Sequence, residues 1–71
     1  MHKFTVSCTR PKHKLLGEGK SIADAKNLVI DHYEKETGET LSGVDRIVCT
    51  TSLMVAHAVD LGKYHYILEN Q

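Results

Sequence analysis

The stretch that decides the fold is GEGKSIADAKNLVIDHYEKETG, residues 17–38, in which a glycine-rich turn leads into an amphipathic segment. Ser21 stands where a helix N-cap is expected, and Asp24 follows it at the spacing of a capping box. Gly38 stands where a left-handed terminator is needed. Residues at three- and four-residue spacing would share one face of the helix: Ile22, Ala25, Leu28, Val29, His32 and Tyr33. The stretch predicts a helix from about Ser21 to Thr37.

The residues before this helix predict a β-hairpin. Phe4, Val6 and Cys8 alternate with polar residues, which is the period of a half-buried strand. Pro11 ends the alternation because it lacks an amide hydrogen and fixes φ. Residues 13–17 then return as a short second strand.

The residues after the helix are ambiguous. The β-branched run 44–50 predicts a strand. Residues 52–62 contain good helix formers and can be interpreted as a short helix. We favour a strand that continues to Val59, a three-residue loop at 60–62 and a final strand at 63–69. This register places His57 opposite His65.

The sequence therefore predicts one α+β domain over residues 1–71, with a ββαββ-like plan. An antiparallel sheet of four or five strands carries one helix packed across it. One sheet face is then left without a helix, and because both faces are rather apolar, we expect two copies to pair as a homodimer. The expected core, besides one face of residues 54–68, is Phe4, Val6, Ile22, Ala25, Leu28, Val29, Tyr33, Ile47 and Cys49.

Composition points to a globular chain without a membrane partner. The sequence is 41% hydrophobic and 25% charged, which argues against intrinsic disorder. No apolar run reaches the roughly 18 residues that span a bilayer, and the N-terminus does not read as a signal peptide. We expect a cytoplasmic protein.

Cys8 and Cys49 lie in strand-like runs without a Cys-x-x-Cys unit, so we expect two buried thiols.

Charge is balanced overall but uneven along the chain. Residues 1–20 hold five basic residues and one acidic residue, whereas residues 21–45 hold two basic and six acidic residues. A chain without a net basic character is no general nucleic-acid binder. It can still hold one phosphate-bearing ligand or attract a complementary copy of itself.

The first candidate site is the turn Gly19, Lys20 and Ser21, where free backbone N–H groups at a helix start could receive a phosphate. A nucleotide-binding P-loop needs a glycine five residues before Gly19, and Lys14 stands there instead. The competing interpretation is structural: the glycines turn the chain and Ser21 caps the helix.

The second candidate site is the basic turn that contains Arg10, Lys12 and Lys14. Such a turn can contact phosphates of a nucleic acid, and Tyr64 and Tyr66 would supply stacking if their strand face pointed outward. The competing interpretation is a solvated turn with both tyrosines in the core.

His57 and His65, as cross-strand neighbours beside Tyr64 and Tyr66, form a third candidate, a partner surface. Two histidines can share a zinc ion, but a structural site needs four ligands, and no other residue has ligand spacing. We therefore expect neither a metal nor another cofactor. A histidine pair at a subunit interface would respond to pH.

The plan of a hairpin running into a helix is similar in outline to small antitoxin-type domains of the HicB kind. The likeness rests on Gly19, Ser21, Asp24 and Ala25, and it transfers no functional residue. The chain shows no nucleophile–base–acid arrangement, so we expect no enzyme. We expect a small regulatory module that binds a protein partner or a phosphate-bearing ligand, as virus- or mobile-element-encoded accessory proteins do; the alternative is a nucleic-acid-binding or antitoxin-like domain.

Overall fold

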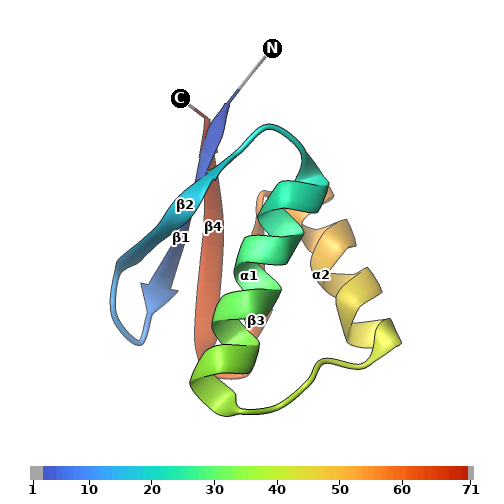
Figure 1. Cartoon of the computed structure of the whole chain (residues 1–71). Coiled ribbons are helices and arrows are strands. Elements are labelled where there is room, and N and C mark those ends of the chain that lie inside the picture. The colour runs from blue at the N-terminus through green and yellow to red at the C-terminus, as the bar shows by residue number, and fades with distance from the viewer. Residues whose placement is uncertain (1–2, 71) are drawn as a thin grey trace.

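The computed structural model describes residues 3–70 and has the element order ββααββ (Figure 1). Two hairpins enclose a pair of helices, so the α+β class is confirmed, with two helices in place of the one expected. The elements are β1 (Phe4–Arg10), β2 (Lys14–Gly19), α1 (Ile22–Thr37), α2 (Gly43–Ala56), β3 (Ala58–Leu61) and β4 (Tyr64–Asn70).

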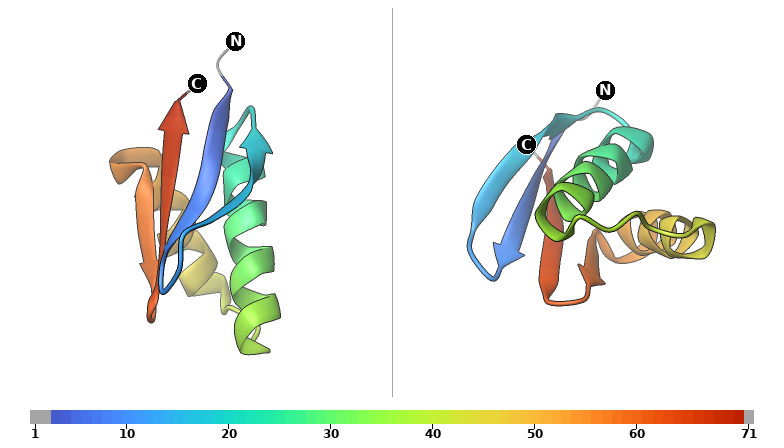
Figure 2. Two further views of the ribbon diagram at one scale, coloured as in Figure 1. Left: turned by 90° about the vertical axis from the view of Figure 1, so that its left-hand side faces the viewer. Right: turned by 60° about the horizontal axis from the view of Figure 1, so that its bottom comes forward.

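Within the described residues, the strands form one four-stranded antiparallel sheet in the order β2-β1-β4-β3. The first and last strands therefore pair in the middle of the sheet, where Val6 of β1 lies opposite Leu68 of β4 and Cys8 lies opposite Tyr66. Both helices lie on one face of this sheet. The opposite face has no helix over it and is turned to the viewer in the left panel of Figure 2.

The helix α1 begins and ends as its sequence predicts. The Ser21 side-chain oxygen accepts a hydrogen bond from the Asp24 amide at 3.2 Å. Gly38 has a φ of 71°, a left-handed conformation that glycine adopts without steric cost, and its N–H donates to the Glu34 carbonyl at 2.8 Å. These two caps satisfy backbone groups that the helix itself leaves unpaired.

The core lies between the sheet and the two helices. Both cysteines are buried and unpaired, as predicted. Four other residues expected in the core are only partly buried. Phe4, Leu28 and Tyr33 pack against the core from its edge, and Ile22 is also half-buried. The buried apolar residues are Val6, Cys8, Ala25, Val29, Ile30, Leu41, Cys49, Leu53, Val59, Leu61, Tyr64 and Tyr66.

The strand predicted at 44–50 is wrong, because these residues form most of α2. Ser42 caps α2 as Ser21 caps α1: its side-chain oxygen accepts from the Asp45 amide at 3.1 Å. Cys49 and Leu53, four residues apart, then bury one side of the helix. Strand propensity is context-dependent, and here the cap and this packing override it. Ile47 was expected in the core and is instead exposed.

The predicted register of the C-terminal hairpin is also wrong. α2 extends to Ala56, and His57 is its C-cap residue, so β3 begins only at Ala58. Leu61 pairs with Tyr64 across a two-residue turn in place of the three-residue loop expected. Asp60, not His57, therefore stands opposite His65.

The uncovered face of the sheet is more polar than expected. Alternate residues of β1 and β4 line it, and two of its threonines bond to the neighbouring strand. The Thr5 hydroxyl donates to the Glu69 carbonyl at 3.5 Å and the Thr9 hydroxyl donates to the His65 carbonyl at 3.3 Å. The face is nevertheless mixed, because Leu15, which is 60% exposed, and the half-buried Ile67 stand on either side of Ser7 on it.

Neither helix within residues 3–70 combines the length and the apolar character that crossing a membrane requires.

Candidate protein-binding surface

The largest group of exposed apolar side chains lies on α2. Only Cys49 and Leu53 of this helix are buried. Five large apolar side chains on the rest of the helix are each more than half exposed, from 52% for Val48 to 80% for Val55. Single exposed apolar residues are ordinary, whereas a contiguous group marks an interaction site. We call this group the α2 surface: Val44, Ile47, Val48, Met54 and Val55.

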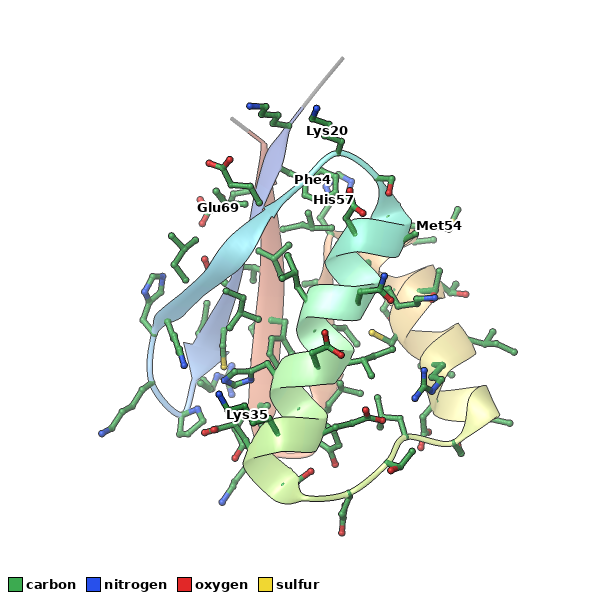
Figure 3. All side chains as sticks on the ribbon, in the orientation of Figure 1. Phe4, Lys20, Lys35, Met54, His57 and Glu69 are labelled. Carbon is green, nitrogen blue, oxygen red and sulfur yellow. The ribbon has the colours of Figure 1, made fainter. Side chains whose placement is uncertain are left out.

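The spacing of these residues places them on one side of the helix. Val44, Val48 and Val55 follow one another, with Thr51 between the last two, at steps of four, three and four residues. Residues three and four apart are neighbours on a helix surface, so the four form one line along α2. Met54 borders this line near the C-terminal end of α2, on its outer side (Figure 3).

A partly exposed polar clamp links the start of α2 to α1. Glu34 of α1 accepts two hydrogen bonds through Oε2, from Arg46 Nη2 at 3.1 Å and from the Leu41 amide at 3.0 Å. Arg46 Nε also donates to the Leu41 carbonyl at 3.3 Å. The connection between the helices and the first turn of α2 are therefore tied to α1 at one point.

The α2 surface carries no charge. The charged residues of α2 are Asp45 and Arg46, near its start. Residues 47–56 contain no acidic or basic side chain. Depletion of charge is typical of the centre of a protein–protein interface. A shallow depression of about 240 Å³ adjoins the surface at Ile47; it is lined by Lys26, Arg46, Ile47, Thr50 and Thr51.

The predicted phosphate site is occupied by a carboxylate of the chain itself. Lys20 lies at the turn between β2 and α1 (Figure 3), and its backbone N–H donates to Asp24 Oδ2 at 3.0 Å. A Cβ at Gly19 would lie 2.8 Å from both Phe4 and Asp24, so a bare glycine is needed for this tight approach. Lys3 and Lys20 line the adjoining depression together with Glu18 and Asp24, so the two cations there are offset by two carboxylates. Phosphate binding by Gly19, Lys20 and Ser21 stays a prediction that this geometry does not favour.

The basic turn is exposed, whereas the two tyrosines predicted to stack beside it are buried. Arg10, Lys12 and Lys14 are exposed together at one end of the β1–β2 hairpin. Tyr66 is 0% exposed and Tyr64 is buried beside it, so neither ring offers a base a surface on which to stack. Tyr64 lines a shallow pocket together with Lys12 and Lys14, but with 9% of its surface exposed it offers little of its ring for the stacking that single-stranded nucleic-acid sites use.

The two buried tyrosines instead form an aromatic cluster with the half-buried His32. Nδ1 of His32 lies 2.8 Å from the Tyr66 hydroxyl, and the two rings meet edge to face with centroids 5.6 Å apart. Tyr64 stacks on Tyr66 at 6.5 Å. Burial lowers the pKa of His32 and raises the pKa of Tyr66, so both side chains are held in their neutral forms.

His57 and His65 do not form the predicted pair. His57 is exposed at the end of α2, whereas His65 lies on β4, where its Nδ1 contacts the Asp60 carboxylate. Within residues 3–70, no three His, Cys, Asp or Glu side chains gather as a metal site would require.

Sequence reasoning named no residue of the α2 surface as a site. Two signals for it were present: Ser42 and Asp45 repeat the capping spacing of Ser21 and Asp24, and the apolar residues of 44–55 recur at helical spacing. Comparisons of the chain with models of protein families, with curated proteins and with solved structures found no match.

Proposed function

We propose that this chain is a small, non-catalytic binding module that docks a protein partner on the α2 surface. The observation that carries the proposal is the contiguous, uncharged group of five exposed apolar side chains on a clamped helix. Removing one Val, Ile or Met side chain from water contributes about 1.5–3 kcal/mol, so covering the group supplies a substantial driving force.

A protein is the better-supported partner because the alternative sites lack the groups that phosphate or nucleic acid needs. The Asp24 carboxylate accepts the hydrogen bond of the Lys20 backbone N–H, and the Tyr66 ring is fully buried. The α2 surface, in contrast, offers no donor or charge for a phosphate and suits an apolar protein surface.

Site-specific photo-crosslinking in the producing cells tests the proposal. Benzoylphenylalanine replaces Val48 at the centre of the α2 surface or, as the control, Asp31 on the exposed side of α1. We expect protein adducts from position 48 and none from position 31. Equal adducts from the two positions, or none from position 48, would contradict the proposal.

The nucleic-acid alternative has its own measurement. Binding of short oligonucleotides, followed by fluorescence anisotropy at several salt concentrations, should be absent in the wild type. Salt-dependent binding that weakens in the double variant Lys12→Ala and Lys14→Ala would instead favour the basic turn as the site.

A further inference from the structure

The symmetry of the α2 surface indicates what covers it. We infer that its occupant is a second copy of this chain, with the two α2 helices packed antiparallel about a twofold axis. This inference rests on the proposed function, because it names the protein that the α2 surface binds.

The line of residues along α2 is complementary to itself when reversed. Its steps of four, three and four residues read the same in both directions. In an antiparallel pair centred between residues 49 and 50, Val44 faces Val55 of the second copy, and Val48 faces Thr51 of the second copy. An isologous twofold contact requires this reciprocity: if Val44 of the first copy contacts Val55 of the second, then Val55 of the first copy contacts Val44 of the second.

The residues beside this line fit the same arrangement. Ile47 and Met54 lie seven residues apart on the same flank, so each copy's Ile47 approaches Met54 of the other copy. The spacing is that of an antiparallel helix pair in which apolar residues fill the seam. On the other flank, Asp45 approaches Ser52 of the second copy, so no like charges meet.

The chemistry of the surface also favours a second copy over an unrelated protein. Interfaces of homodimers are more apolar at their centre than those of separate proteins that associate transiently. Binding energy in the latter is concentrated in Trp, Tyr and Arg anchors, and the α2 surface contains none of these. Its aliphatic side chains resemble half of a hydrophobic core, which is typical of an interface between identical subunits.

The length of α2 suits an interface of ordinary size. Its 14 residues extend about 21 Å, at roughly 1.5 Å per residue, and the α2 surface runs from its second residue to its last turn. A stable dimer buries about 800 Å² on each partner. The five exposed side chains supply the apolar centre of such an interface, and the depression beside Ile47 extends the contact toward α1.

Disulfide trapping tests both the occupant and its orientation. The variants Val44→Cys and Val55→Cys are prepared separately, mixed and oxidised, and their products are separated on a non-reducing gel. Both positions are exposed, and the native Cys8 and Cys49 are buried, so the introduced thiols react first. Circular dichroism of each variant verifies that it folds, and a mixture of Val55→Cys with Asp31→Cys is the control.

The antiparallel register predicts a covalent dimer in the mixture of Val44→Cys and Val55→Cys and none in either variant alone. Identical positions would lie about 16 Å apart along the helices, eleven residues at ~1.5 Å each. A disulfide needs Cα atoms within about 7 Å. Cross-linking of each variant with itself, or equal cross-linking in the control mixture, would overturn the inferred arrangement.

The absence of any covalent dimer would overturn the inference that a second copy is the occupant. If position 48 then still gave adducts with other proteins in cells, the proposed protein-binding function would stand without it. If position 48 gave no adduct either, both would fail.

Discussion

Nδ1 of His32 lies 2.8 Å from the hydroxyl of Tyr66, and this contact joins the middle of α1 to the centre of the sheet. Tyr66 is fully buried, and its ring stacks on Tyr64, whose ring in turn meets Tyr33 edge to face at 5.8 Å. The contact gives the buried Tyr66 hydroxyl a hydrogen-bond partner, and a buried polar group without a partner is costly in a protein core.

The variant Tyr66→Phe should therefore be less stable than the wild type. It removes the hydroxyl and its hydrogen bond to the half-buried His32, at a cost of about 0.5–1.5 kcal/mol in the free energy of unfolding. Urea denaturation measures the change. Tyr64→Phe is the matched control, because its hydroxyl has no hydrogen bond within residues 3–70; equal losses in the two variants would contradict the role given to the His32–Tyr66 bond.

Stability should fall as the solution becomes acidic, in part through His32. Burial lowers the pKa of His32 below its ordinary value of 6.5, so between these two pKa values the unfolded state binds more protons than the folded state. The stabilisation is complete above pH 6.5 and is lost as the pH falls toward the folded pKa, below which the effect levels off. Denaturation at a series of pH values should show a shallower decline for His32→Gln than for the exposed control His13→Gln. An unchanged decline in His32→Gln would count against this account.

His57→Gly should stabilise the protein. His57 caps α2 with a φ of 56°, a left-handed conformation that costs a residue with a Cβ roughly 1 kcal/mol and costs glycine little. We expect a gain of about 0.5–1 kcal/mol, measured by chemical denaturation. Gly38→Ala is the matched control at the end of α1, where φ is 71° and no atom lies within 4 Å of the added Cβ, so it should lose a similar amount. A loss of stability in His57→Gly would contradict the assigned cap.

The two sides of α2 should respond differently to substitution. Leu53 is fully buried, and Leu53→Ala should cost about 2–5 kcal/mol through lost burial and a cavity. Val48→Asp, measured at low protein concentration where chains are separate, should change stability by no more than about 0.5 kcal/mol, because the side chain contacts water. A large loss in Val48→Asp under these conditions would show that Val48 belongs to the core.

The sequence predicted α1 correctly because its caps and its periodicity agree. Ser21, Asp24 and Gly38 fix its ends, and both ends are found where expected. The same Ser-x-x-Asp cap precedes α2 at Ser42, but there the β-branched residues of 44–50 favour a strand by local propensity. The helix forms because its capped start and its buried Cys49 and Leu53 outweigh that preference, and packing of this kind depends on the whole chain.

The errors at the C-terminal hairpin follow from the missed helix. Because α2 extends to Ala56, β3 contains only the four residues Ala58–Leu61. The pairing with β4 therefore places Asp60, and not His57, opposite His65. The alternation that sets Tyr64 and Tyr66 on one strand face was predicted correctly. Which face is covered, and hence that the tyrosines are buried, depends on the position of two helices that no local pattern specifies.

The candidate site could not be predicted from residue chemistry. The α2 surface consists of aliphatic side chains, which in a sequence are indistinguishable from core residues, as the expectation for Ile47 shows. They become a surface only once Cys49 and Leu53 are known to be the side of α2 that packs inward. The basic turn and Lys20 were predicted as sites because charged residues can be recognised in a sequence. In the structure, Asp24 accepts the hydrogen bond of the Lys20 backbone N–H, and the tyrosines near the basic turn are buried.

Sedimentation equilibrium of the wild type and of Val48→Asp tests the central claim most directly. At high protein concentration, the wild type should sediment with about twice the 7.9 kDa mass of one chain, because a second copy covers the α2 surface. Val48→Asp should sediment as a single chain with an unchanged circular dichroism spectrum, because a carboxylate would be buried unpaired in the seam. A wild type that remains a single chain at the highest concentration, or a Val48→Asp variant that associates as strongly as the wild type, would contradict the account.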